Sequence, residues 1–431
     1  MKSQNQPRTP IFANRNFSLL FVGSSVSALG DQFTLVALPW LVLKLTGNPA
    51  ALGIVLAVMA FPRATFMLIG GAVVDRMSPR QVLLGARTVN AACIAILAVL
   101  VLTGAIHMWM IYLLALGIGL STAFAYPAGT AILPQVVESS QLRTANALFM
   151  GMRQLSMIVG PVLAGLVISL GAHSASSQSL TDARGMGLAF SIDALSFLFS
   201  LASLLMVRIH SDSHPAKIVG GMLASVLAGI RSVWADLPLR AFVLYAACVS
   251  VFVGGPIQVG LPVLADTRLD LGAASLGILM TANGVGMFTG SFLSGFGTRL
   301  MRGRLGIMVL CFDGLSGLVI AGLTLVHNTA TGAVLLVCAG LLTGIVQIAI
   351  FTWIQQRVPQ EMMGRTMSIL LFTFMGLGPV SAAVAGALLK VISLPELFAG
   401  AGLILTVIAL ACLNSRQLRG IGMNQTMAAR A

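Results

Sequence analysis

The chain has 431 residues, of which 57% are hydrophobic and only 9% are charged, and its formal net charge is +13. A soluble globular domain carries about 25% charged residues, so this composition excludes a soluble enzyme or binding domain and indicates a surface that faces lipid. Because the basic residues lie in short stretches between apolar segments, they indicate membrane topology, and we expect no nucleic-acid partner.

Twelve apolar segments follow one another along the chain, and each is long enough to cross a membrane as a helix of about 20 residues. They are 17–44, 50–75, 81–104, 108–133, 144–170, 185–207, 240–264, 272–298, 305–326, 330–356, 366–390 and 394–414. The stretches between them are too short for a soluble domain. The predicted fold class is an all-α membrane protein with twelve transmembrane helices in two pseudo-symmetric six-helix bundles.

Five parts are expected along the chain. They are a cytoplasmic N-terminal tail (1–16), an N-terminal six-helix bundle (17–207), a cytoplasmic linker (208–239), a C-terminal six-helix bundle (240–414) and a basic cytoplasmic tail (415–431). The pattern of apolar and basic residues at 227–234 predicts a short amphipathic helix on the membrane surface.

Short repeats in the same order predict that the two bundles arose by duplication. The repeated pairs are Leu52–Ile54 with Leu276–Ile278, Gly71 with Gly295, Pro134-Gln135 with Pro359-Gln360, and Gly160–Val162 with Gly378–Val380. The offset between the copies stays between 218 and 225 residues. Parallel repeats of this kind build transporters whose binding site lies between the halves, near the middle of the bilayer.

The distribution of basic residues predicts the orientation. On one side of the predicted spans, 18 lysines and arginines lie in the loops and tails, and on the other side only 4. The positive-inside rule therefore places both termini in the cytoplasm, and we expect a multi-pass protein of the cytoplasmic (inner) cell membrane.

Asp31, near the middle of the first span, is the candidate proton-coupling residue. Ser24, Ser27, Asp31 and Thr34 are spaced to share one helix face, which should point inward. Arg63 lies at similar depth in the second span. A charge at the bilayer centre costs about 2.5–3.5 kcal/mol, so the two should pair or reach water. Either Asp31 carries the proton while Arg63 favours its charged form, or the pair is structural.

The stretch from Gly70 to Arg80 is the most specific local pattern. Glycines at the end of the second span precede an aspartate and two arginines in a short loop, and this stretch resembles the loop motif of the major facilitator superfamily. The resemblance implies a gate on the cytoplasmic side. Its residues would be Gly71, Asp75, Arg76 and Arg80, with Arg365 at the start of span eleven.

Further stretches resemble the drug:proton antiporter branch of that family, which includes macrolide and enterobactin exporters. They are Ser27–Asp31, Pro127-Ala128, Leu142–Leu148, Ile192–Phe197 and Val358–Arg365. Span five resembles the antiporter signature through Gly151, Gly160, Pro161 and Gly165. The sequence also departs from the family: span four has no arginine, and Arg299 stands where the second loop motif would have its aspartate.

The resemblance implies a cavity lined mainly by spans one, four, seven and ten, with Arg153 in span five as a further candidate. The cavity candidates are Ser27, Thr34, Thr122, Tyr126, Arg153, Tyr245, Phe252, Gln258, Gln347 and Trp353. Arg153 either faces an anionic substrate group or reaches the membrane surface. For Asp193 and Asp313, local helix contacts are expected. Aromatic walls suit large amphipathic ligands, whose binding depends on buried area.

These observations predict a proton-coupled exporter of an amphipathic small molecule such as a drug, an antibiotic or a siderophore. The alternative within transport is an importer of an anionic metabolite anchored by Arg63 and Arg153. A lipid-modifying membrane enzyme is the remote alternative, because the chain has no acid–histidine cluster or nucleophile motif. We expect no cofactor and no metal, since the five cysteines lack metal-ligand spacing. The expected partners are substrate, protons and lipid, and the expected state is a monomer.

Overall fold

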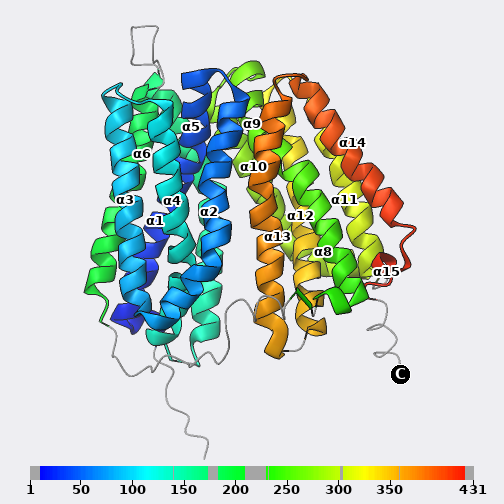
Figure 1. The fold of residues 1–431 in the computed structure, drawn as a ribbon, viewed down its shortest axis with the longest axis horizontal. Helices are drawn as coiled ribbons and strands as arrows, with labels where there is room; N and C mark the ends of the chain where they lie inside the picture. The colour runs from blue at the N-terminus through cyan, green and yellow to red at the C-terminus, as the bar shows by residue number, and fades with distance from the viewer. Residues whose placement is uncertain are drawn as a thin grey trace, which may run out of the picture.

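The computed structural model describes residues 10–138, 140–172, 183–208, 230–231, 233–300, 304–358 and 360–422. Within these ranges the side chains of 64, 67–76, 296–300, 360–361, 364–365, 368, 371 and 374–375 are not described. The long elements of the described chain are all helices, and they stand side by side in one bundle (Figure 1).

The helices fall into two halves in chain order. The first half holds α1 (Arg15–Thr46), α2 (Pro49–Arg76), α3 (Pro79–Leu102), α4 (Met108–Ile132), α5 (Leu142–Ala172) and α6 (Ala183–Met206). The second half holds α8 (Leu237–Val249), α9 (Gly255–Arg268), α10 (Ala273–Leu300), α11 (Leu305–Gly322), α12 (Thr329–Arg357), α13 (Gln360–Leu388) and α14 (Leu394–Cys412). Short helical pieces complete the fold: η1 (Ile11–Ala13), η2 (Leu133–Gln135), η3 (Ser250–Gly254), η4 (Leu323–Leu325) and α15 (Arg416–Arg419).

The helices α1 to α6 and α8 to α14 cover the twelve apolar segments that the sequence predicts as crossings. Within the described residues, ten helices are long and apolar enough to cross, and α8, η3 and α9 together form one of them. The helices α2 and α13 have 28 and 29 residues and contribute the apolar stretches Pro49–Arg63 and Gly376–Leu388. The prediction of an all-α membrane protein is confirmed.

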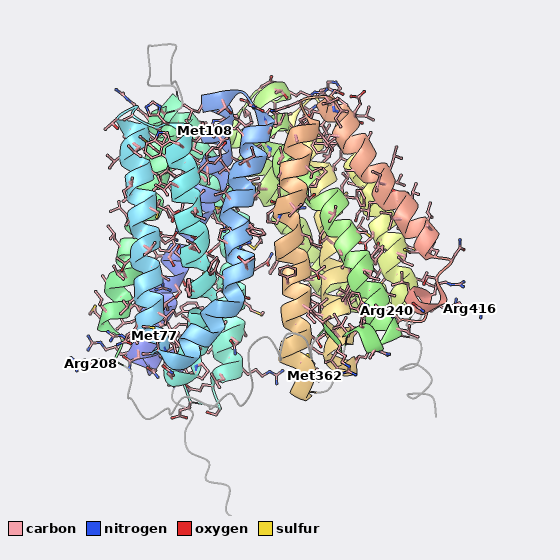
Figure 2. The ribbon with its side chains drawn as sticks, viewed as in Figure 1. Met77, Met108, Arg208, Arg240, Met362 and Arg416 are labelled. Atoms are coloured by element: carbon pink, nitrogen blue, oxygen red, sulfur yellow. The ribbon has the colours of Figure 1, made fainter. Side chains whose placement is uncertain are left out.

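The bundle has two ends. Figure 2 shows Met108, at the start of α4, at one end, which we call the far end. Met77, Arg208, Arg240 and Arg416 lie at the opposite end, which we call the tail end. The first helix begins at the tail end, where the Asn14 side chain accepts hydrogen bonds from the first free backbone amides of α1.

A glycine with a left-handed backbone lies between the first and second crossings of each half. Gly47 caps the end of α1 with a φ of 58°, and Gly272 directly precedes α10 with a φ of 52°. Glycine adopts this left-handed conformation without a Cβ penalty, so it lets the chain turn back between the two crossings. The two glycines occupy equivalent places in the two halves, which supports the predicted duplication.

The two halves meet along two helix pairs, α2 with α13 and α5 with α10. A Cβ atom added at Gly53 of α2 would lie 2.5 Å from the Ala382 carbonyl oxygen of α13. At Gly277 of α10, an added Cβ would collide with the Pro161 carbonyl oxygen of α5. These two glycines belong to the repeat that links the halves in the sequence, so each copy places the same glycine at the seam between the halves. Such close backbone contact is typical of small residues in membrane helices.

Two GxxxG patterns hold α10 and α12 together. A Cβ added at Gly286 or Gly290 of α10 would strike the backbone of α12, and one added at Gly340 or Gly344 of α12 would strike the backbone of α10. The contact is therefore reciprocal, with backbone against backbone over two turns of each helix.

The seventh crossing contains a π-helical turn, η3, between α8 and α9. Ser381 of α13 lies against this turn. Its Oγ accepts a hydrogen bond of 2.8 Å from the Gly255 amide and donates one to the Val251 carbonyl. The serine therefore satisfies backbone groups that the wider helical turn leaves free. The expected span at 240–264 is thus longer, from Leu237 to Arg268, and interrupted.

Most of the linker, where an amphipathic helix was predicted at 227–234, lies outside the described residues. Residues 230–231 and 233–235 are helical, and Val233 is buried. Asp236 then caps α8 by accepting from the Leu239 amide, and it pairs with Arg357 of α12 at 2.7 Å. This ion pair fixes the start of the second half against its neighbouring helix.

Candidate functional site

Asp31 lies near the middle of α1, with its side chain accessible yet deep within the protein. The positive charges that act on it are the guanidinium groups of Arg153 on α5 and Arg87 on α3. Within the described part of the chain, Asp31 accepts no hydrogen bond and forms no ion pair. An accessible carboxyl group at this depth must face a space that protein side chains do not fill.

One reading of the sequence expected Arg63 to pair with Asp31, but the two side chains do not pair. Both side chains are described, and no ion pair joins them. The charged neighbour of Arg63 is a second arginine, Arg153, and its Nε atom is buried without a hydrogen-bond partner. The shared depth of the two residues was correctly read, but depth does not fix which way a side chain points around its helix.

Arg153 connects these groups. Its guanidinium carbon lies 5.8 Å from the centre of the Tyr126 ring on α4. Arg153 and Tyr126 are both exposed, like Asp31. Because four side chains from α1, α2, α4 and α5 interact through Arg153, they face one common space in the first half. The sequence-predicted residues Asp31, Arg63, Tyr126 and Arg153 are therefore brought together.

A buried polar cluster lies behind Asp31, between α1 and α6. Asp193 of α6 is 0% exposed, and its carboxylate accepts hydrogen bonds from Thr34 of α1 and from Ser196 at 3.3 Å. An added Cβ at Gly30 would lie 2.7 Å from Asp193 Oδ1, so the glycine makes room for this carboxylate. A local helix contact was expected for Asp193. Its hydrogen bond from Thr34 is such a contact, and it joins α6 to α1 beside Asp31.

Arg87 belongs to the same interface, and the sequence analysis gave it no role. It donates to Ser24 Oγ at 2.9 Å and to the Ser200 carbonyl at 3.3 Å, and it is 8% exposed. Ser200 also lies 3.5 Å from Ser27. The signal in the sequence that could have revealed this interface is the repeated spacing of Ser196, Ser200 and Ser203 along one face of α6.

The other predicted cavity residues divide into two groups. Phe252, Gln258 and Gln347 are exposed. Tyr245 and Trp353 are buried, at 5% and 4%. Tyr245 donates a 2.7 Å hydrogen bond to Asp313 of α11, and Trp353 packs edge-on against Phe242. Of the remaining candidates, Ser27 and Thr34 lie in the α1–α6 interface, and Thr122 donates to the Ile118 carbonyl of its own helix.

The antiporter-like motif of α5 lies at two helix contacts. An added Cβ at Gly160 would collide with the side chain of Gln32 on α1, and one at Gly165 would lie 2.6 Å from the Ala273 carbonyl oxygen of α10. In the second half, a Cβ added at Gly378 of the repeat would lie 3.3 Å from Gln258 Nε2, so each copy places its glycine against a glutamine. Gly151 faces open space.

The predicted gate lies mostly outside the described side chains. The side-chain positions that are not described include Gly71, Asp75, Arg76 and Arg365. The contact expected between Asp75 and the region of Arg365 therefore stays a prediction. Arg80 is described, and it donates to the Leu205 carbonyl at 2.8 Å, which ties the start of α3 to the end of α6.

At the far end, side chains of the two halves contact each other. Lys44 at the end of α1 pairs with Asp266 at the end of α9, with 2.8 Å between Nζ and Oδ1. The Lys44 ammonium lies over the Trp40 ring, and an added Cβ at Gly272 would lie 3.3 Å from that ring. Deeper along the seam, Thr281 donates to the Ile158 carbonyl at 2.7 Å.

Comparisons with known proteins agree with this architecture. The sequence profile described as Major Facilitator Superfamily matches residues 20–383. The multidrug efflux pump Tap of Mycolicibacterium fortuitum is 25% identical over 382 residues, which cover 86% of this chain and 88% of that protein. The enterobactin exporter EntS of Shigella boydii is 25% identical over 349 residues, or 81% of this chain and 79% of that protein.

Solved structures show the same fold. A variant of the nucleoside transporter NupG matches with a TM-score of 0.70 at 13% identity, covering 92% of this chain and 99% of that chain. A bacterial homologue of the iron transporter ferroportin, solved in an inward-facing state, matches with a TM-score of 0.69 at 16% identity. It covers 92% of this chain and 98% of its own.

Proposed function

Because the chain belongs to the Major Facilitator Superfamily, whose members are secondary transporters and not enzymes, we propose that it exports an amphipathic small molecule in exchange for protons. The substrate class would be a drug, an antibiotic or a siderophore. Support for export comes from the relatives, which are described as a multidrug efflux pump and an enterobactin exporter.

Asp31 carries the proton in this proposal, and one observation supports this role above the others. It is an embedded carboxyl group that is accessible and lacks an ion-pair partner among the described residues. Embedded charges are costly and usually mark transport pathways. Its charged neighbours are the guanidinium groups of Arg153 and Arg87, so the carboxylate formed by proton release lies near positive charge.

The tail end faces the cytoplasm in this proposal. Arg208, Arg240 and Arg416 gather at that end (Figure 2), as the positive-inside rule requires of cytoplasmic loops. The far end, where Lys44 pairs with Asp266, would then face outward. Transport would proceed by alternating access, with the two halves opening one end of the bundle at a time.

The test uses purified protein in proteoliposomes that contain a pH-sensitive dye. A pH gradient is imposed, and panels of amphipathic drugs and siderophores are added. We expect substrate-dependent proton movement in the wild type and its loss in Asp31→Asn. Asp313→Asn is the matched control, because Asp313 is also embedded but is held by Tyr245 in the second half. Proton coupling that persists in Asp31→Asn would remove Asp31 from this role.

A second candidate is the import of an anionic metabolite, and the proximity of Arg63 to Arg153 favours it. The direction of flux decides between the two functions. When the outer compartment of a vesicle is acidic and protons flow inward, a proton-exchanging exporter expels substrate that was loaded inside. An importer coupled to protons instead moves its anion inward with them.

A further inference from the structure

The central charges of the first half lie in one layer. Asp31, Arg63, Arg87, Tyr126 and Arg153 each lie about 14 to 19 residues from the far end of their helices, which is roughly 21 to 29 Å along the axis. They come from five consecutive helices, α1 to α5. A ligand in the space that Asp31, Arg63, Tyr126 and Arg153 face would meet α1, α2, α4 and α5 at one depth.

Positive charge is in excess in this layer. Arg87 is partnered by Ser24 and Ser200, and Asp193 is enclosed by Thr34 and Ser196, so neither faces the shared space as a free group. Two guanidinium groups, Arg63 and Arg153, then lie in the same space as the single carboxyl group of Asp31, and of these two only Arg153 interacts with it. One positive charge is left over whenever Asp31 is charged, and two are left over when it is protonated.

Among the described side chains, no hydrogen bond involves the guanidinium donors of these two arginines. The Nε of Arg63 is buried and has no hydrogen-bond partner. Arg153 makes no hydrogen bond within the described residues; its guanidinium instead lies over the Tyr126 ring. A buried donor without a partner is costly, and two guanidinium groups close enough to repel each other add to that cost. An anion between them would remove both penalties.

We propose that Arg63 and Arg153 form an anion-binding subsite flanked by the Tyr126 ring, so that the transported molecule is an amphipathic acid. The guanidinium edges would bind an anionic oxygen group, for which their planar donor arrays are suited. The aromatic ring would pack on the apolar part beside that group. This inference rests on the proposed transport function and specifies its substrate class.

Asp31 competes with the substrate anion for the same positive charge. Protonation of Asp31 removes the competing carboxylate from Arg153, so anion binding and proton binding should favour each other at this site. Positive linkage of this kind loads the proton and the anion together, so at this site it favours the symport of the second candidate over exchange.

The test compares two probes with the same ring skeleton, 8-anilinonaphthalene-1-sulfonate and the uncharged N-phenyl-1-naphthylamine. Binding to purified full-length protein is measured by calorimetry, with the heat of mixing into empty detergent micelles subtracted. We expect the wild type to bind the sulfonate at least tenfold more tightly than the neutral probe. Arg63→Gln and Arg153→Gln should each abolish this preference, while Arg63→Lys should retain part of it.

Two further variants separate a binding role from a structural one. Arg357→Gln, at a surface ion pair of the second half, should leave the preference unchanged. Asp31→Asn should tighten sulfonate binding severalfold, which a purely structural arginine would not produce. Equal binding of the two probes, no saturable binding by folded wild type, or an unchanged preference in both glutamine variants would overturn the proposal.

The binding assay needs no proton gradient, so its failure is distinct from failure of the transport proposal. Sulfonate preference without substrate-driven proton movement would support the subsite and reject proton-coupled export. Proton-coupled export of neutral or cationic compounds, with no acid preference, would reject the subsite and leave the exporter intact.

Discussion

Lys44 and Asp266 join the two halves of the molecule by an ion pair of 2.8 Å at the far end. The side chains remain 39% and 23% exposed, so water screens the attraction. Exposed ion pairs contribute about 0–1 kcal/mol to stability. The pair is therefore better suited to favouring one arrangement of the halves than to holding either half folded.

Breaking this ion pair should shift the arrangement of the halves with little effect on unfolding. In Lys44→Gln we expect a change of less than about 1 kcal/mol in the free energy of unfolding. Spin labels at positions 103 and 391, in a background without the five native cysteines, should show a larger population of long distances between the halves. The exchange Lys44→Asp with Asp266→Lys should restore the original distances, and identical distributions in all forms would contradict the idea.

Asp193 should matter for stability through its hydroxyl partners. Asp193→Ala leaves the buried Thr34 hydroxyl without its acceptor, whereas Ser196 keeps its 2.7 Å hydrogen bond to the backbone carbonyl of residue 193. The change should cost about 1–3 kcal/mol and lower the apparent melting temperature. Asp193→Asn keeps an acceptor oxygen and should cost less. Asp270→Asn, at an exposed position, is the control. An alanine variant as stable as the wild type would show that this interface does not depend on the carboxylate.

The seam glycines should tolerate no side chain. Gly53→Val and Gly277→Val each place atoms into the backbone of the opposite half, so we expect loss of monodisperse protein or a marked drop in melting temperature. Gly151→Val is the control, because an added Cβ there meets open space. If all three variants behaved alike in size-exclusion chromatography and thermal unfolding, the close contact would be unimportant.

The π-helical turn should loosen when Ser381 loses its hydroxyl. Ser381→Ala removes the acceptor for the Gly255 amide and the donor to the Val251 carbonyl. We expect faster hydrogen–deuterium exchange over residues 250–255, while α3 and α6 exchange as before. Ser381→Thr keeps the hydroxyl and should exchange more slowly than the alanine variant. Equal exchange in wild type and Ser381→Ala would show that the turn is stable without this serine.

The sequence predicted the crossings well, because their length and apolarity are set by the thickness of the bilayer. It also identified the repeat that places Gly53 and Gly277 at the seam, since equal sequence motifs in a duplicated chain occupy equal positions. It could not predict the interruption of the seventh crossing by η3, because a π-helical turn depends on the contact with Ser381 from a distant helix.

The candidate site was predicted in part. Asp31, Arg63, Tyr126 and Arg153 were all identified from embedded charge or position, and they lie together. The pairing of Asp31 with Arg63 failed because two residues at the same depth can still point in different directions. An arginine without a carboxylate partner and next to another arginine has no signature in the sequence.

For the second half, aromatic composition was a poor guide to the cavity. Tyr245 and Trp353 were chosen as cavity residues from their spans, but each is buried against a neighbouring helix. A helix that touches several neighbours presents aromatic side chains to all of them. The identity of a residue and the number of its span therefore do not fix which way its side chain points. Asp313, which holds Tyr245, was expected to make a local contact, and its hydrogen bond is consistent with that expectation.

The glycine contacts at the seam have a mechanical consequence. Gly53 and Gly277 lie near the far ends of α2 and α10, each about 40 Å long, so they can act as the fulcrum of a lever. A tilt of about 10° around such a fulcrum moves the opposite end of a 40 Å helix by roughly 7 Å. Because α10 and α12 touch backbone to backbone, they would swing as one rod. A small rotation at the far end is therefore enough to widen the tail end by more than the thickness of an aromatic ring.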